Sequence, residues 1–377
     1  MKIYLIAGEN SGDYIGSKLI CSLKKISNSV EINGIGGVNM QNIGFKSLFD
    51  IKEINLMGFF EILPHIFRLK KLINKTVEDI IDKKTEILVT IDSPGFTYRV
   101  ANKLKALAPH IKLVHIVAPS VWAYKPKRAL KYANLYDLML TLFLFEPDYF
   151  NIHGLKSICI GHPIFQQKFY AKTDQLRSEF NIGENVKAIA VTPGSRIGEI
   201  NRHMPIIIDS FNELSKKHNI KVIFIQSDES NFKHIEKYLE NINFDYSLTI
   251  ERLKAFAACD VALAKSGTNS LEIAASGTPM IVGYLLNSLS FFLLKLMIKI
   301  KYACLINIIS NEEIIPEYIQ NNFNTKNIVL KLNEILNNDS MAQEQINKSK
   351  LILNNIGFES AKIPSDIAAR QIIDMIK

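Results

Sequence analysis

Short β-branched runs alternate with helical patterns along most of the chain, and this alternation limits the fold more than any other feature. Strands separated by helices of such length form right-handed β-α-β units and parallel sheets that helices cover on both faces. The predicted strands are 2–7, 31–35, 86–91, 112–117, 138–143 and 157–160, then about 187–192, 221–225, 247–250, 260–263 and 279–283. Helices are expected at 13–26, 62–82 and 98–107, then near 199–217, 231–241, 251–258 and 268–276. The pattern therefore predicts an α/β fold.

The chain has 377 residues, too many for one core, so two domains are expected. Polar and charged residues replace the strand pattern between about 165 and 185. We expect Rossmann-like domains at 1–170 and 171–350, and a helical segment at 351–377 that packs on the first domain or on a partner subunit. Two such domains facing a cleft would place ligands at the carboxyl ends of their strands.

Composition narrows the class of protein. The net charge of +8 comes without an arginine-rich stripe, so no nucleic-acid partner is expected. The four cysteines show no CxxC spacing, which argues against disulfides and a zinc site. The apolar run in MKIYLIAG is too short for a secretory signal, which favours a cytoplasmic protein. Residues 273–294 are uncharged, but Gly277 and Pro279 interrupt them, so we expect no membrane span there.

The stretch LIAGENSGDYIG, residues 5–16, predicts a turn from a strand into a helix. Its glycines, Gly12 among them, allow close packing, and Ser11 is the expected N-cap of the helix. Asp13 would then lie at the positive end of the helix, where an acid is stabilising. Glu9 could instead accept hydrogen bonds from the hydroxyl groups of a substrate. The residues alone leave a capped helix and a binding turn equally open.

Two further turns follow strands of the first half. In TIDSPGFTYR, Asp92 either caps the next helix or, in a cleft, takes a proton from an attacking hydroxyl. In HIVAPSVWAYKPKR, Ser120 and Trp122 would project from a loop, where an aromatic ring can stack on a sugar or an acyl chain or pack beneath the loop. His115 lies within the strand pattern and is expected to be a core histidine.

Two turns of the second half resemble anion sites. In VTPGSRIGEI, the backbone N–H groups of Gly194 and Ser195 at a helix start, with the guanidinium of Arg196, suit a diphosphate. A capped helix with an Arg196–Glu199 ion pair is the alternative. In AKSGTNSLE, the second such turn consists of Ser266, Gly267 and Thr268, and the carboxylate of Glu272 one turn later could hold the ribose hydroxyls of a nucleotide.

The segment 54–75 is dense in leucine, isoleucine and phenylalanine and is flanked by arginine and lysine. A basic amphipathic helix of this kind can lie on an anionic membrane surface. A helix packed in the core is equally compatible with the pattern.

Taken in order, the motifs resemble those of the lipid-A-disaccharide synthases, a family of bacterial glycosyltransferases. The matching stretches are AGENSGD, MGFFEILP, IDSPGF, APSVWAYKPKR, FEPDYF, GHP, PGSRIGEI, SGTNSLE and PMIVGY, and they run over roughly residues 3–320. The resemblance implies a glycosyltransferase-B fold without a metal or cofactor. It also implies inverting transfer of 2,3-diacylglucosamine from UDP to 2,3-diacylglucosamine 1-phosphate, with a β-1,6 linkage, at the inner face of the inner membrane.

The resemblance also assigns roles to residues. Asp92 occupies the position that activates the acceptor hydroxyl, Glu9 lies in an acidic turn important for activity, and Arg196 lies where an arginine serves the UDP part. Asn307 in CLINII matches an asparagine near the donor. The chain departs from the family at Gly95, where a second acid is common, and at Leu285, where a basic residue is usual, and Ile306 replaces the usual proline before the asparagine. The family suggests a homodimer with C-terminal exchange.

Two other functions fit the same sequence pattern. One is another UDP-sugar enzyme of the same fold, either a transferase acting on a peptidoglycan precursor or an epimerase. The other is a non-catalytic carrier of lipids or nucleotides.

Overall fold

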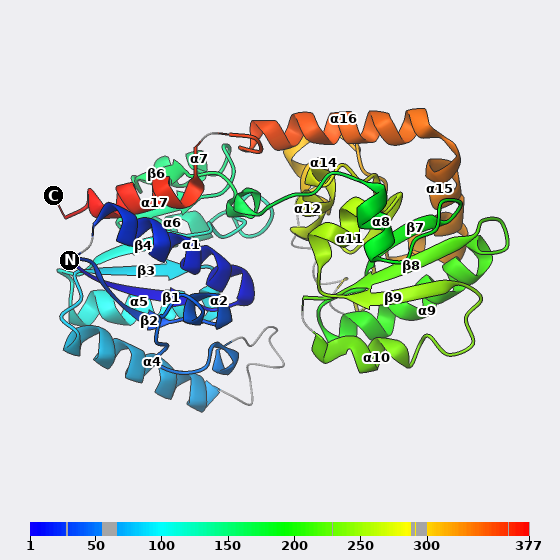
Figure 1. Ribbon diagram of the computed structural model, residues 1–377. Coiled ribbons are helices and arrows are strands. Elements are labelled where there is room, and N and C mark those ends of the chain that lie inside the picture. The colour runs from blue at the N-terminus through cyan, green and yellow to red at the C-terminus, as the bar shows by residue number, and fades with distance from the viewer. Residues whose placement is uncertain are drawn as a thin grey trace. The chain divides into compact units, whose positions relative to one another are not determined.

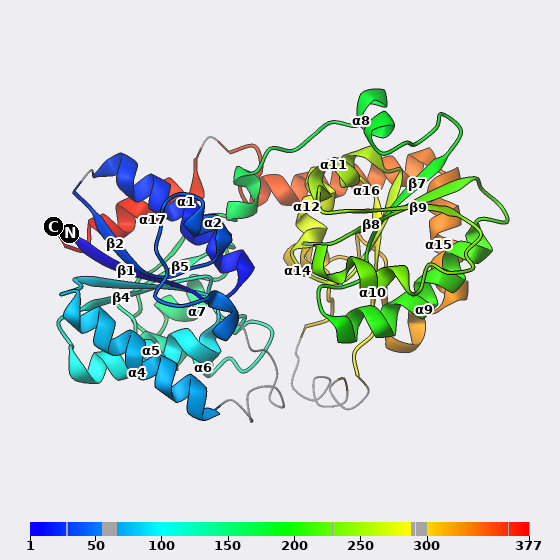
Figure 2. The ribbon, with the colours of Figure 1, turned by 60° about the horizontal axis from the view of Figure 1, so that its bottom comes forward.

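The computed structural model describes residues 1–27, 29–54, 66–227, 229–287, 291, 300–360 and 362–376. The chain divides into two compact units, one made of Met1–Gln166 with Ser360–Lys377 and the other of Gln167–Glu359. The sequence places the junction a few residues later, at 170/171. Figures 1 and 2 show each unit as a sheet covered by helices.

The sheet of the first unit has six parallel strands in the order β2-β1-β3-β4-β5-β6. Its central strands are almost wholly buried runs of aliphatic residues, as expected when helices cover both faces. The bounds are β1 Lys2–Ala7, β2 Glu31–Ile35, β3 Ile87–Ile91, β4 Lys112–Ile116, β5 Leu138–Thr141 and β6 Ser157–Cys159.

Helices α1 and α17 cover one face of this sheet, and α4 and α5 cover the other (Figures 1 and 2). Ser22 Oγ in α1 lies 2.8 Å from Ser365 Oγ and 2.6 Å from an oxygen of Asp366, which joins the last helix to the first. The bounds are α1 Asn10–Ile26, α2 Val38–Gln41, η1 Ile51–Glu53, α4 Ile66–Asp82, α5 Pro94–Leu107, α6 Arg128–Ala133, α7 Asp148–Asn151, η3 Pro163–Gln166 and α17 Pro364–Ile373.

The second unit repeats the architecture with the strand order β12-β11-β10-β7-β8-β9, again parallel. The bounds are β7 Lys187–Thr192, β8 Ile220–Ile225, β9 Asp245–Thr249, β10 Val261–Ala264, β11 Met280–Tyr284 and β12 Glu317–Ile319. Two doubly wound parallel sheets confirm the predicted α/β fold with two Rossmann-like domains.

Helices α9, α10 and α15 lie on one face of the second sheet, and α11, α12 and α16 lie on the other (Figure 1). The expected segment 351–377 is divided, because α16 ends within the second unit whereas α17 belongs to the first. The bounds are α8 Asp174–Glu179, α9 Ile197–Leu214, η4 Glu229–Asn231, α10 Phe232–Glu236, α11 Arg252–Ala258, α12 Asn269–Ala275, α14 Leu305–Ser310, η5 Gln320–Asn322, α15 Thr325–Asn337 and α16 Asp339–Asn355.

Residues 55–65 of the amphipathic segment 54–75 fall outside the described residues, which include Ile54 and the first ten residues of α4. In α4, Leu69, Leu72 and Ile73 are buried, so this part of the apolar face contributes to the core. Phe67, by contrast, is 88% exposed. Among the helices that the structure describes, none is long and apolar enough to cross a membrane. The part of the uncharged stretch 273–294 that follows Asn287 lies almost entirely outside the described residues.

Candidate functional site

The opening turn of the first unit leads from β1 into α1. Glu9, with an extended backbone, occupies the N-cap position, and the helix begins at Asn10. The prediction that Ser11 is the N-cap is therefore wrong, because the chain enters the helix two residues earlier and Ser11 lies exposed in its first turn. Gly12 is buried, and a Cβ there would lie 3.4 Å from two atoms of Ile91 in β3. This glycine lets α1 pack closely on the sheet.

Asp13 has an internal structural role in this turn. Its carboxylate is 2% exposed and accepts hydrogen bonds from the backbone N–H groups of Gly37, Asn39 and Met40, at 2.7, 2.7 and 3.1 Å. The Asn39 side chain donates a further bond of 2.9 Å. These bonds stabilise the start of α2. Binding of a substrate by Asp13 stays a prediction, and Glu9 is the half-exposed carboxylate of the turn.

Asp92 directly follows β3 and lies on the loop next to the opening turn. Strands β1 and β3 are neighbours, with Ala7 opposite Ile91, so the residues after each strand emerge at one edge. A Cβ at Gly8 would overlap the Ser93 side chain, so the two turns are in close contact. The register thus brings Glu9 and Asp92, which are far apart in sequence, to adjacent loops.

The backbone around Asp92 has an uncommon conformation. Asp92 and Ser93 both have φ of 50°, in the left-handed region that favours glycine. The Ser93 N–H donates a 2.7 Å hydrogen bond to Asp92 Oδ1, and Thr97 Oγ1 donates to the Asp92 carbonyl at 2.7 Å. Burial raises the pKa of Asp92, although the Ser93 bond opposes this effect. A carboxylate with a raised pKa is better matched to accepting a proton near neutral pH.

The loop that follows β4 at the same edge carries Ser120 and Trp122. Ser120 is exposed, whereas Trp122 is half-buried and its indole N–H donates a 3.2 Å hydrogen bond to Glu146. Burial raises the pKa of Glu146, which also accepts bonds from two backbone N–H groups. His115 is confirmed as a core histidine, since it is buried and bonds to Thr90 at 2.8 Å. Burial lowers its pKa to about 3, so it carries no charge at neutral pH.

In the second unit, the turn Gly194–Arg196 joins β7 to α9. Gly194 has φ of 134°, and a Cβ there would lie 2.6 Å from that of Glu199, so both conformation and space favour glycine. The helix begins at Ile197 with Arg196 as N-cap, two residues later than the helix start at Ser195 that the motif indicated. Ser195 and Arg196 are exposed, which leaves the helix start accessible to an anion.

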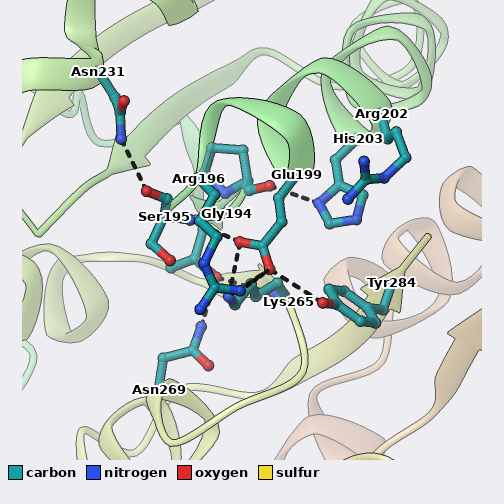
Figure 3. Close-up of polar contacts among 12 residues, drawn as sticks. Gly194, Ser195, Arg196, Glu199, Arg202, His203, Asn231, Lys265, Asn269 and Tyr284 are labelled. Carbon is teal, nitrogen blue, oxygen red and sulfur yellow. Dashed lines mark hydrogen bonds and ion pairs between the residues drawn. The ribbon is translucent and has the colours of Figure 1, made fainter. Parts of the chain in front are cut away.

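The carboxylate of Glu199 lies beneath this turn and connects it to two other strands (Figure 3). It accepts hydrogen bonds from the Ser195 N–H at 3.1 Å and from the Tyr284 hydroxyl of β11 at 3.1 Å. The Lys265 ammonium lies 2.9 and 3.1 Å from its two oxygens, and the Arg196–Glu199 pair that sequence offered as an alternative is present at 3.8 Å. The sequence motif did not indicate the contacts with Lys265 and Tyr284.

A second set of bonds fixes the backbone of the turn from outside. His203 is the seventh residue of α9, and its Nδ1 donates a 2.6 Å bond to the Pro193 carbonyl while its Nε2 accepts from the Leu285 N–H at 3.0 Å. Burial lowers the pKa of His203, in keeping with this neutral form. Gln226 donates to the Gly194 carbonyl at 2.9 Å and Asn231 to the Ser195 carbonyl at 3.2 Å.

The turn Ser266–Thr268 follows β10. Gly267 has φ of 152°, and Ser266 Oγ donates a 2.8 Å bond to the Ala303 carbonyl. Strands β7 and β10 are neighbours, with Thr192 opposite Ala264, so this turn and Gly194–Arg196 lie at one edge of the sheet. The turns Gly194–Arg196 and Ser266–Thr268 are about seventy residues apart in sequence. Each contains small residues and leads into a helix, and the strand pairing places the two turns next to each other.

Glu272 and Asn307 are both buried. Glu272 pairs with Arg252 at 2.8 Å and accepts from Gln167 at 3.2 Å, and burial raises its pKa although Arg252 opposes this. Asn307 is fully buried and makes four hydrogen bonds of 2.7 to 2.9 Å, to Ile314, to Glu317 and to both backbone groups of Ile315. It stabilises the loop after α14, and a direct contact with a donor stays a prediction.

Within the described part of the chain, no group of three or more histidine, cysteine, aspartate or glutamate side chains is arranged to hold a metal ion. The first unit has two carboxylates, those of Glu9 and Asp92, on adjacent loops. The second unit has two turns, Gly194–Arg196 and Ser266–Thr268, that are suited to binding an anion.

Comparisons with known proteins agree with this arrangement. A family model described as lipid-A-disaccharide synthetase matches residues 3–372. The chain is 55% identical to a lipid-A-disaccharide synthase from Rickettsia felis over 375 residues, which covers 98% of this chain and 95% of that protein. It is 53% identical to the Rickettsia prowazekii protein of the same name over 374 residues, which covers 98% of both chains.

Solved structures share the fold at low sequence identity. A UDP-GlcNAc 2-epimerase from Neisseria meningitidis, bound to UDP-GlcNAc, superposes with a TM-score of 0.65 at 14% identity, covering 100% of this chain and 99% of that one. MurG from Acinetobacter baumannii gives a TM-score of 0.59 at 10% identity, covering 99% of each. These are glycosyltransferase-B-type structures, as expected from two doubly wound domains. The chain belongs to the lipid-A-disaccharide synthase family, and it is a glycosyltransferase.

Proposed function

We propose that this glycosyltransferase moves 2,3-diacylglucosamine from UDP-2,3-diacylglucosamine to 2,3-diacylglucosamine 1-phosphate, giving the β-1,6-linked disaccharide 1-phosphate and UDP. Family membership over nearly the whole chain is the observation that carries the proposal. A UDP-sugar and a lipid are the substrate classes of the family. An epimerase or a carrier is not favoured, since the epimerase likeness lies at 14% identity and shows the fold alone.

Asp92 is the proposed general base. Its carboxylate takes the proton of the acceptor hydroxyl while that oxygen bonds to the anomeric carbon of the donor. The bond from this carbon to the diphosphate oxygen breaks from the opposite side, so the configuration inverts. The raised pKa of Asp92, caused by burial, supports the assignment. Glu9, on the loop next to it, would hold a hydroxyl of the sugar and so orient the attack.

Other residues of the first unit would contact the acceptor. Ser11 and Gly12 lie in the first turn of α1, whose N–H groups suit the phosphate of a sugar 1-phosphate. The exposed Ser120 and the half-buried ring of Trp122 are suited to the sugar or an acyl chain. Their shared sheet edge supports a single acceptor site on this unit.

The second unit is the proposed donor site. The helix start at Gly194–Arg196 would bind the diphosphate, with Arg196 stabilising the charge that develops on UDP as it leaves. The turn Ser266–Thr268 would contact the same ligand, and Glu272 would hold the ribose.

Membrane attachment and dimerisation are the least direct parts of the proposal. Phe67 is 88% exposed, and Arg68, Lys70 and Lys71 beside it are exposed, which suits the surface of an anionic bilayer at the cytoplasmic face of the inner membrane. Equal sedimentation of the protein with neutral and with anionic vesicles would contradict membrane attachment.

The protein is also proposed to form a homodimer. Analytical ultracentrifugation tests this assembly, and a monomer at all concentrations would contradict the homodimer.

The reaction is tested by incubating the protein with UDP-2,3-diacylglucosamine and 2,3-diacylglucosamine 1-phosphate and analysing the lipid by mass. The expected product is the disaccharide 1-phosphate, formed with one UDP for each linkage. A donor that lacks acyl chains is the matched control and should be used poorly. Equal use of the acyl-free donor would favour another UDP-sugar enzyme, and binding without any transfer would favour a carrier.

A further inference from the structure

Lys265 places a second cation beside the turn Gly194–Arg196, although it comes from another strand. It follows β10 directly, and its backbone N–H donates a 3.1 Å bond to Thr192 Oγ1 at the end of β7. The pairing of these two strands therefore fixes where the lysine side chain starts. Figure 3 shows the side chains of Lys265 and Arg196 reaching the same carboxylate, that of Glu199.

Glu199 holds the lysine in place from below. The Glu199 side chain is 4% exposed, whereas that of Lys265 is 22% exposed, so the carboxylate lies deeper than the ammonium group. Burial raises the pKa of Glu199, but the charge and hydrogen bond of Lys265 outweigh this effect and leave it lowered. The carboxylate is therefore ionised at neutral pH.

The charges around the turn favour an anionic ligand. Arg196 and Lys265 contribute two positive charges against the single negative charge of Glu199, so one positive charge remains uncompensated. The Glu199 oxygens already accept bonds from Ser195 and Tyr284. Nearby, the buried Oδ1 of Asn269 finds no hydrogen-bond donor among the residues that the structure describes. The diphosphate has only acceptor oxygens, so a donor to this group would have to come from another part of the ligand, such as a ribose hydroxyl.

We propose that Lys265 is a diphosphate-binding residue of the donor site, and that Glu199 is the positioning residue that holds its ammonium group beside the turn Gly194–Arg196. The inference rests on the proposed function and adds one contact to it. A nucleoside diphosphate reaches the lysine through its phosphate oxygens, whereas the nucleoside alone does not.

Calorimetric titration of the full-length protein with UDP and with uridine tests the first half of the proposal. Lys265→Met should weaken UDP binding about tenfold or more and leave uridine binding within about twofold, since a hydrogen bond to a charged group is lost only for the diphosphate. Lys331→Met is the matched control, because Lys331 in α15 also makes an ion pair, of 2.6 Å with Glu334, and its side chain is 26% exposed. It should change neither affinity.

Two further variants separate a binding role from a structural one. Lys265→Arg keeps the charge and should restore most of the UDP affinity. Glu199→Gln should weaken UDP binding, and Lys265→Met combined with Glu199→Gln should bind UDP no more weakly than Lys265→Met alone, because Glu199 acts through Lys265. Tighter UDP binding by Glu199→Gln would show that the carboxylate competes with the ligand, and would overturn the positioning role.

The remaining results distinguish a failure of the Lys265 assignment from a failure of the proposed function. Unchanged UDP affinity in Lys265→Met would overturn the inference, while disaccharide formation by the wild type would leave the proposed function intact. Equal losses for UDP and uridine, with a lowered melting temperature, would show a structural role only. No UDP binding and no transfer by the wild type would instead contradict the proposed function itself.

Discussion

At the scale of single residues, the first unit sets one carboxyl group apart. Asp92 combines burial, a left-handed backbone and a raised pKa at the end of a strand. Strained backbone and perturbed pKa values concentrate at functional sites. Asp13, the acid near the start of α1, is bound by four donors of its own chain. Hydrogen bonding thus separates carboxylates that sequence alone treats alike.

Asp92→Asn removes the proposed base without changing the size of the side chain. We expect kcat to fall about 10²- to 10⁴-fold while UDP binds as before. In the wild type, activity should be lost as the pH falls through the Asp92 pKa, because the base must be deprotonated. Since burial raises that pKa, the loss should begin at a higher pH than for an ordinary carboxyl group. A pH–rate profile measures both effects, and unchanged turnover of the variant would exclude Asp92.

Gly8→Ala tests the contact between the opening turn and the Asp92 turn. The added Cβ would overlap the Ser93 side chain, so one turn must shift. We expect a loss of about 1–3 kcal/mol in the free energy of unfolding, together with a lowered kcat. Gly95→Ala is the control, since a Cβ at Gly95 has no atom within 4 Å. Denaturant unfolding of both variants measures the difference, and equal stabilities would contradict the contact.

At the scale of elements, buried parallel strands are the part that sequence predicts well, because both faces are apolar and the β-branched run is continuous. Strand β12 was missed since it has only three residues, all half-buried, at the edge of the sheet. Helix α15 was missed too, and its three asparagines have low helix propensity.

The candidate site was predictable only where its residues are close in sequence. The turns Gly194–Arg196 and Ser266–Thr268 follow from strand ends, glycine and helix starts. The contact of Lys265 with Glu199 joins residues that are 66 positions apart and depends on β7 lying next to β10. No local pattern encodes strand order, so this pair required the structure.

Asn307→Ala tests the loop after α14. Removing the amide leaves the buried N–H groups of Ile314 and Ile315 without their acceptor, and this should cost about 2–4 kcal/mol in the free energy of unfolding. Asn337→Ala is the control, because Asn337 is exposed and bonds mainly to its own helix. Thermal unfolding measures both. A stable Asn307→Ala variant with weakened donor binding would instead indicate a direct contact with the donor.

At the scale of the whole molecule, two units of the same architecture carry different chemistry at their strand ends. The loops of the first unit present Glu9 and Asp92, and those of the second present helix starts with Arg196 and Lys265. An acid beside a diphosphate would weaken binding unless a cation is paired with it, as Lys265 is with Glu199, whereas an acid beside a hydroxyl can hold that hydroxyl and accept its proton. Duplicated sheets with opposite charges at their loops are therefore consistent with one substrate on each unit.

Hydrogen–deuterium exchange with and without UDP tests this division most directly. We expect UDP to slow exchange of the backbone N–H groups at 194–199 and 266–272, where the helix starts would bind the diphosphate. The turns at 8–13 and 92–97 should exchange as in the free protein. Protection of 8–13 by UDP, with none at the two later turns, would contradict the account.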